Sequence, residues 1–445
     1  MKKLHIMGNV DWYAKEFSEF ESKLNGQATT DLHNIRKKAI KSFVDLGYPT
    51  TKNEEWKYTD VTSLAEHNFY YFQEPVANLV DSEDIKRFKF SDLDCYTLVF
   101  VNGQFVPGLS NNTAPSNVIM KSIGAAYNNN REIISEYLSH YARFDSDSFT
   151  ALNTAFLQDG TLIYVPNDVV LDKPIHILYL SKTNEKHVLT QPRTIIVAGQ
   201  NSQVKIIETH ADLDNGIYFA NVVDEVVLHS NATVEHFKLQ LESKHAYHIA
   251  TTQVHQERDS NYTSHLFSAG GSLVRNNLNS VLDASGAQCI LNGLYIANDN
   301  QHVDTHTVID HAKPHCNSHE LYKGILNDRA GGVFNGKIYV RPDAQKTNAI
   351  QANNCLLLSD DATIDTKPQL EIYADDVKCT HGATVGQLDE EAFFYLRSRG
   401  IDKEVARNLL IYAFASDVID RIEIDQVRER VANLFADKLH TIKPV

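Results

Sequence analysis

The stretches NSQVKIIE (residues 201–208) and NATVEHFKLQL (residues 231–241) decide the fold of this chain. Each begins with a polar turn and continues as a short segment of alternating apolar and polar residues, which is the pattern of a β-strand. Similar strand starts follow at Gly286, Gly331 and Asp361, so the five starts recur at uneven intervals. This loose repeat predicts coils of two or three short strands with insertions. Stacked coils bury a core that one coil could not bury alone, as in a β-solenoid.

A β-sandwich is the alternative architecture for so many short strands. Sandwiches show turn signals about every 8–12 residues, and many have a Cys or Trp pin in the core. The mixed strand lengths and the absence of such a Cys or Trp favour the solenoid. We therefore expect a mainly β protein whose core spans residues 151–388.

Helical regions are expected on both sides of this core. Residues 1–150 combine helical periodicity, as in the segment 11–24, with a hairpin signal at Asn102-Gly103, and form a mixed accessory domain. Residues 389–445 carry three helical patterns. The first begins after Asp389 and is expected to turn its apolar side chains inward, namely Phe393, Phe394 and Leu396. A small helical module of this kind suits a docking role.

The composition restricts the classes of function. Lys plus Arg is 42 and Asp plus Glu is 57, so the net charge is −15, and so acidic a chain repels the phosphates of nucleic acids and of anionic membranes. A hydrophobic content of 42% indicates a globular protein. The five cysteines include no CxxC pair, which favours a reducing compartment. Without a secretory signal or a long apolar run, we expect a cytoplasmic protein.

Enzyme motifs are scarce. The segment GGVFNGK (residues 331–337) has the GxxxxGK spacing of a phosphate loop, but Ile338 stands where Ser or Thr would bind magnesium. The segment also leads into a strand, whereas a phosphate loop needs the amides of a helix N-terminus. The sequence contains no GxGxxG, HExxH or GxSxG motif. We therefore expect no nucleotide on this chain.

Histidines gather between residues 302 and 319. Imidazole and thiolate groups bind iron or zinc, and the run contains His302, His306, His311, His315 and His319, with Cys316 among them. The β-branched neighbours predict strands, on which residues of the same parity share a face. A metal site is one interpretation. Polar residues on the faces and turns of a solenoid are the other and simpler one.

The sharpest feature is KCTHGATVG (residues 378–386), at the end of the β region. Cys379 and His381 lie two positions apart, so on an extended chain they share one face. A thiolate beside an imidazole suits a soft metal or a sulfur carrier. Two ligands do not complete a four-coordinate site, so the others must come from distant residues or from a second chain. A buried structural Cys beside a hydrogen-bonded His remains the alternative.

Three stretches carry a family resemblance. They are QLEIYADDVKCTHGATVGQLDEEAFFYLRSRGI (residues 369–401), HVDTHTVIDHAKPHCNSHELYKGIL (residues 302–326) and NEEWKYT (residues 53–59). Together they resemble the SufB/SufD family of iron–sulfur cluster assembly proteins over nearly the whole chain. The KCTHGATVG form is similar to the SufD branch, and the residues that follow contain no cysteine, where SufB is expected to have one.

The resemblance implies a right-handed parallel β-helix and a scaffold subunit without turnover of its own. Such a subunit pairs with SufB through the β-helices, and it binds the ATPase SufC through its carboxy-terminal helices, which carry Phe393, Phe394, Leu396, Arg397 and Arg399. It also implies a transient iron–sulfur cluster at the SufB interface, with His381 as a ligand and Cys379 beside it. Complexes of the family are associated with reduced flavin, although no flavin motif is present here.

Two rival functions remain at this stage. One is a stand-alone metal-binding protein built on the histidines of residues 302–319. The other is a carbohydrate-active β-helix enzyme, which needs convergent carboxylates or a basic cleft that the sequence does not show. A chain purified alone is expected to form a homodimer through the surface meant for SufB.

Overall fold

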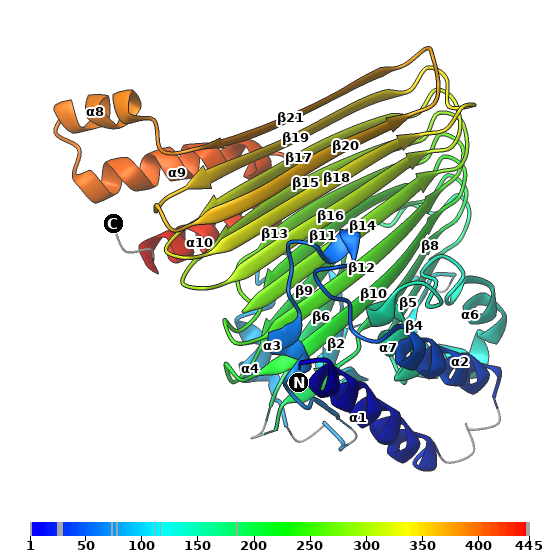
Figure 1. The fold of residues 1–445 in the computed structure, drawn as a ribbon. Helices are drawn as coiled ribbons and strands as arrows, with labels where there is room; N and C mark the ends of the chain where they lie inside the picture. Colours follow the sequence, from blue (N-terminus) through cyan, green and yellow to red (C-terminus); the bar gives the residue numbers. More distant parts are fainter. Residues whose placement is uncertain are drawn as a thin grey trace.

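The computed structural model describes residues 2–24, 30–72, 74–76, 79–111, 113–115, 117–183 and 186–441. It is a β-solenoid with helices from both ends of the sequence (Figure 1). Helices of the amino-terminal region lie against the first coils, α9 and α10 lie across the strands of sheet B, and α8 lies near the last coil. The prediction of a mainly β solenoid core is confirmed, and the sandwich alternative is wrong.

Two parallel sheets form the walls of the solenoid. Sheet A has the strand order β20-β18-β16-β14-β12-β10-β8-β5-β4; off this path, β7 pairs with β10 and β1 pairs with β7. Its strands are β1 (Tyr70–Tyr71), β4 (Ile119–Ser122), β5 (Thr161–Val165), β7 (Val188–Thr190), β8 (Arg193–Ala198), β10 (Tyr218–Leu228), β12 (Tyr247–Gln256), β14 (Leu273–Leu282), β16 (His302–His311), β18 (Gly331–Val340) and β20 (Thr363–Ile372).

Sheet B has the order β21-β19-β17-β15-β13-β11-β9-β6-β2-β3. Its strands are β2 (Tyr96–Val101), β3 (Gln104–Phe105), β6 (Ile175–Ser181), β9 (Gln203–Asp212), β11 (Thr233–Leu241), β13 (Asn261–Ser268), β15 (Gln288–Ala297), β17 (Asn317–Leu326), β19 (Asn348–Leu357) and β21 (Lys378–Gly386). From β9 onward, successive strands alternate between the two sheets, so one coil is one strand of each.

A repeated turn sets the length of the coils. At the second position before each strand of sheet B from β9 to β19, the backbone has a positive φ between 55° and 82°, and a small, fully buried residue follows. The positive-φ residues are Asn201, Asn231, Asp259, Gly286, His315 and Lys346. The amide of Asn201 donates to the carbonyl of Ser230, and that of Asn231 to Arg258, so each turn is bonded to the next coil.

This turn corrects the irregular repeat expected from the sequence. Strands of sheet B begin at nearly even intervals, at Gln203, Thr233, Asn261, Gln288, Asn317, Asn348 and Lys378. The starts near Gly331 and Asp361 belong to sheet A, whereas the other three belong to sheet B. The wide intervals between strand starts on either side of Gly286 have two causes. The turn at Asp259 was not recognised in the sequence, and strand starts from both sheets were counted as one series. The coils contain two strands of similar length and no large insertion.

The amino-terminal region follows its local signals. Thr30 accepts from the His33 amide and caps α2 (Asp31–Leu46), and the Asn102-Gly103 turn has a positive φ at both residues. Helix α1 (Lys2–Ser22) begins earlier than the segment 11–24 predicted. The other short helices are η2 (Glu54–Trp56), α3 (Thr62–Ala65), α4 (Ser82–Lys86), η3 (Pro107–Leu109), α5 (Ile123–Asn129), α6 (Arg131–Tyr137) and α7 (Ser148–Ala155).

The carboxy-terminal helices lie on the outer face of sheet B. They are α8 (Glu390–Ser398), α9 (Lys403–Ile419) and α10 (Asp425–Thr441). Apolar residues of α9 and α10, such as Ile411 and Phe435, pack against sheet residues such as Phe237. Helix α8 extends beyond the sheet and contacts mainly α9 (Figure 1). The expectation that Phe394 faces inward is therefore wrong, and its side chain is 73% exposed.

Candidate functional site

Strand β21 forms the open edge of sheet B at the end of the solenoid. It pairs in parallel with β19 on one side, and in the described part of the chain no strand pairs with its other side. Strand β20 ends sheet A in the same way. Unpaired backbone N–H and C=O groups of an edge strand are a template for pairing with another chain.

Cys379 and His381 both lie on β21 and face the inside of the last coil. Alternate residues of a strand share a face, and the register pairs Cys379 with Ala349 and His381 with Gln351, both of which are buried. Cys379 packs against the small apolar cluster around Ile338. His381 is exposed, because no further coil covers it. The shared face expected from the sequence is confirmed.

The Cys379 thiol is not activated within this chain. Burial raises its pKa, and the hydrogen bond with the Ala349 backbone lowers it only in part. The thiolate is the form that binds metal, so Cys379 needs a metal ion or a nearby cation to ionise. Among the described residues, no group of three His, Cys, Asp or Glu side chains is placed to hold a metal ion. The two residues of β21 therefore form an incomplete ligand set.

Two further side chains stand behind His381 in the interior of sheet B. Gln351 is the neighbour of His381 on β19, and Glu320 is the neighbour of Gln351 on β17. Gln351 donates through Nε2 to the Glu320 carboxylate. Burial raises the pKa of Glu320 to about 7, although the Gln351 amide donates to its carboxylate. Sequence patterns contain no signal for this pair, because only the register of successive coils joins its strands to β21.

The histidines of residues 302–319 do not form one site. His302 shares a hydrogen bond with Thr59 (2.9 Å), His306 contacts Asp304 (3.0 Å), and His311 contacts Ser318 (2.9 Å). His315 occupies a turn with a positive φ, and Cys316 is the small buried residue that follows it. These residues lie on the faces and turns of the solenoid, as the simpler interpretation expects.

The NEEWKYT segment crosses the outer face of sheet A. The Arg275 guanidinium lies 3.9 Å from the centre of the Trp56 ring and donates to Asp304 (2.8 Å). Thr59 donates to the same carboxylate (2.6 Å). Burial would raise the pKa of Asp304, but Arg275 and His306 hold it well below its usual range. A cavity of about 670 Å³ lies between this segment and the sheet, away from His381.

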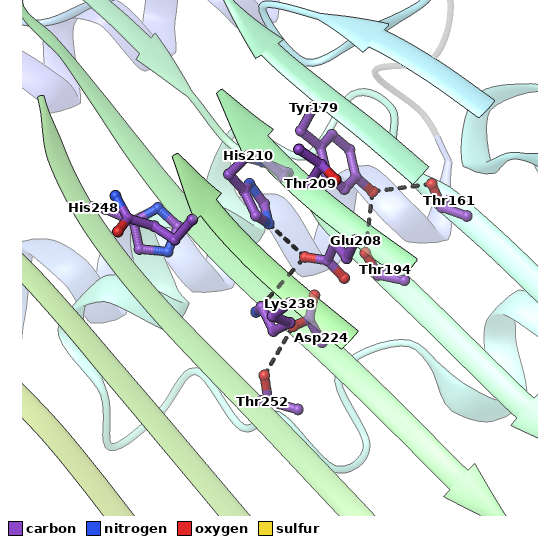
Figure 2. A network of polar contacts seen from close by, with 12 residues as sticks. Thr161, Tyr179, Thr194, Glu208, Thr209, His210, Asp224, Lys238, His248 and Thr252 are labelled. Carbon is purple, nitrogen blue, oxygen red and sulfur yellow. Dashed lines mark hydrogen bonds and ion pairs between the residues drawn. The ribbon is translucent and has the colours of Figure 1, made fainter. Parts of the chain in front are cut away.

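A buried polar network occupies the interior of the middle coils (Figure 2). Lys238 Nζ lies 2.7 Å from Asp224 and 3.6 Å from Glu208, and Glu208 also contacts His210 (2.5 Å) and His236 (3.3 Å). Burial would raise the pKa of Glu208, but Lys238 and the two histidines hold it well below its usual value. These groups are paired mainly with one another inside the core, so none of them is directed at a site on the surface.

The predicted docking residues lie on α8 and, for Arg399, at its C-cap. Phe394, Arg397 and Arg399 are exposed, whereas Phe393 and Leu396 are half-buried. The neighbouring Tyr395 is also exposed, and Val405 and Leu409 of α9 extend the apolar surface, 51% and 48% exposed. We call these exposed side chains of α8 and α9 the α8–α9 surface. An apolar surface of this kind is typical of a protein interface.

Two features that were not expected from the sequence are a phosphate loop and a membrane-spanning helix. The GGVFNGK segment forms strand β18, with Gly332 and Gly336 facing the interior, so it is no phosphate loop. Among the helices of the described residues, none is long and apolar enough to cross a membrane.

Comparison with known proteins gives a consistent result. The family model described as "SUF system FeS cluster assembly, SufBD core domain" matches residues 180–414, and "SufBD protein N-terminal region" matches residues 7–177. An iron–sulfur cluster assembly SufBD family protein of Synechocystis is 34% identical over 420 residues, covering 92% of each chain. The iron–sulfur cluster assembly protein SufD of Escherichia coli is 31% identical over 402 residues, covering 90% of this chain and 91% of its own. SufD of Bacillus subtilis is 27% identical over 441 residues, covering 96% and 97%. The chain therefore belongs to the SufBD family of iron–sulfur cluster assembly proteins.

Proposed function

We propose that the chain is the SufD-like scaffold subunit of a cytoplasmic SufB–SufC–SufD assembly and turns over no substrate itself. The observation that carries this proposal is the position of Cys379 and His381 on an open edge strand. The site is incomplete within the described residues of one chain, and the same edge offers unpaired backbone groups to a second chain. A partner that adds a strand to β21 brings its own ligands next to His381.

In this proposal the nascent iron–sulfur cluster is the cargo. His381 supplies an imidazole ligand, Cys379 lies on the same face of β21, and SufB supplies the remaining thiolate. Imidazole and thiolate are suitable ligands for iron in such clusters. An interface between subunits can also open to release the cluster, which a closed site inside one chain cannot do.

The α8–α9 surface is the proposed binding site for SufC. Helix α8 extends away from the solenoid, and Phe394 and Tyr395 are more than half exposed on it. Arg397 and Arg399 add positive charge beside them. Helix α9 is anchored to the sheet by Lys323, which donates to the Phe414 carbonyl (2.8 Å) and to Asp417 (2.6 Å). A movement of the ATPase would therefore reach the solenoid directly through α9.

Purification of the tagged chain from its host without oxygen tests the proposal. We expect SufB and a SufC-type ATPase to follow the chain, and we expect a homodimer when the chain is produced alone. Recovery of neither partner, together with metal bound tightly to the single chain, would contradict it. The reduced flavin associated with such complexes stays a prediction about the whole assembly.

The role of His381 has its own test. In a reconstituted complex, His381→Ala should lower the yield of cluster while the complex still forms. His319→Ala is the matched control, because His319 lies on the outer face of β17 of the same sheet. Equal cluster yields from wild type and His381→Ala would exclude the proposed ligand role.

A further inference from the structure

We propose that Gln351 positions His381, by accepting a hydrogen bond from the ring N–H that is left free when His381 binds iron. This inference rests on the proposed function, since it concerns the same ligand. It adds a residue for which the sequence holds no signal: an amide buried inside the solenoid, one strand behind the edge.

The register places the two side chains next to each other. Gln351 on β19 is the direct neighbour of His381 on β21, and both belong to the row of residues that faces the interior. The same row contains only buried residues in the earlier coils, namely Ile206, His236, Ser264, Leu291 and Glu320. Gln351 is itself 1% exposed. Its amide therefore lies inside the protein, directly behind the proposed ligand.

The orientation of this amide is determined by Glu320. The Gln351 NH₂ group donates to Glu320 Oε2, and a carboxylate oxygen is an acceptor, so the amide nitrogen must face Glu320. Oε2 is the acceptor of this bond when Glu320 is ionised, and also when its proton is on Oε1. The carbonyl oxygen of Gln351 is consequently directed away from Glu320. Among the described residues it is a buried acceptor without a donor.

Space for the amide is provided by Gly336 on the opposite sheet. A Cβ atom at this position would lie 2.3 Å from Nε2 of Gln351 and 2.7 Å from its Cδ. Any residue other than glycine would therefore displace the amide. Gly336, Glu320 and Gln351 together hold one acceptor in one place, although they come from three different strands.

The unpaired acceptor, Gln351 Oε1, suits the ring N–H of a metal-bound histidine. A histidine that binds a metal through one ring nitrogen carries a proton on the other, and this N–H is nearly always donated to a carboxylate, a carbonyl or water. Such a bond fixes the plane of the ring and makes it a better ligand. Gln351 Oε1 is the buried acceptor nearest in register to His381. A free His381 can remain in solvent, which is where the structure places it.

The experiment compares three variants in the reconstituted complex. Gln351→Met keeps the length of the side chain and removes the acceptor. Gln351→Glu restores an acceptor oxygen, because it can share one proton with Glu320. Asn353→Leu is the matched control, since Asn353 is a buried interior amide of the same strand whose NH₂ donates to Thr366 (3.0 Å) and whose neighbour on β21 is Ala383.

Two readouts separate positioning from packing. The first is the rate at which a chelator removes iron from the assembled cluster, which should rise about 10–100-fold in Gln351→Met and remain near wild type in the other two. The second is pulsed electron paramagnetic resonance of the reduced cluster. The quadrupole coupling of the remote imidazole nitrogen reports its hydrogen bond, so it should shift in Gln351→Met alone. If that variant does not fold, Gln351→Asn, which withdraws the amide by one methylene, carries the same prediction.

The outcomes are distinguishable. An imidazole signal that is lost in His381→Ala but unchanged in Gln351→Met overturns the inference and leaves the proposed function intact. An equal rise in the rate of iron removal in Gln351→Met and Asn353→Leu also overturns the inference, because it would reflect a general disturbance of the packing. A wild-type cluster without any imidazole signal overturns the proposed function itself and the inference with it.

Discussion

Replacement of Lys238 by methionine tests how the interior of the solenoid is stabilised. The Lys238 ammonium lies 2.7 Å from Asp224 and 3.6 Å from Glu208, and both carboxylates are fully buried (Figure 2). Methionine fills a similar volume without the charge. Breaking a buried ion pair by removing one partner costs about 3–5 kcal/mol, since the other charge is left uncompensated. We expect Lys238→Met to lower the unfolding free energy by an amount within this range at pH 7. The loss does not exceed it, because Glu208 keeps its contacts with His210 and His236.

The pH dependence gives the sharper part of this prediction. In the wild type, the pKa of Glu208 is held below its ordinary value, so its contribution to stability is present above pH 5 and is lost only in acid. Without Lys238, the effect of burial on Glu208 is less opposed, and the pKa of Glu208 rises. Protonation then relieves the buried charge. The difference in unfolding free energy between variant and wild type should therefore shrink as the pH falls from 7 to 5.5.

Urea unfolding followed by circular dichroism at the two pH values measures this difference. Lys205→Met is the control, because Lys205 lies on the neighbouring strand β9 but is 41% exposed where it pairs with Glu235 and Glu423. An exposed pair contributes about 1 kcal/mol or less. A cost below about 1 kcal/mol for Lys238→Met, or an equal cost at both pH values, would refute the reasoning.

Three shorter predictions follow from other parts of the structure. Gly286→Ala should destabilise the protein by about 1–2 kcal/mol or more, because φ is +82° and the new Cβ would lie 2.0 Å from the Asp259 carboxylate. His315→Gly in the equivalent turn should not destabilise it, and thermal unfolding of both variants checks this. Phe394→Asp should abolish binding of SufC while pairing with SufB persists, as measured by co-purification; loss of both would contradict separate surfaces. A maleimide should label Cys379 in the native chain faster than Cys289, because Cys379 is only half-buried whereas Cys289 is fully buried and burial raises its pKa to about 12; mass spectrometry of the labelled peptides tests this.

Much of the fold was predictable because the turns carry local signals. Asn201, Asn231 and Gly286 are residues that adopt a positive φ readily, and they revealed the start of a strand. Lys346 occupies the same turn position without any such preference, and His315 is a less usual turn residue than Asn or Gly. Their conformation is imposed by the stacked coils on either side, so a search for turn residues passes over them.

Only the part of the candidate site that lies within one strand was predictable from the sequence. The spacing of Cys379 and His381 places both on one face, and this needs no knowledge of the rest of the chain. Gln351 and Glu320 lie one and two coils before His381, and only the register of β17, β19 and β21 brings the three together. Phe394 illustrates the opposite error. Helical periodicity separates the faces of α8, but it does not indicate which face lacks a neighbour.

The two ends of the solenoid differ, and this difference limits how many chains can assemble. At the first end, both sheets finish in short antiparallel strands, β3 and β4. At the last end, β20 and β21 leave both sheets open. Growth in one direction requires an adhesive edge at both ends of every unit, whereas among the described residues only the last end presents long edge strands. Contact between two open ends consumes the adhesive surface of both, so polymerisation stops at a pair. We therefore expect a protein made largely of stacked β-strands to form pairs, and not fibres, through this exposed edge.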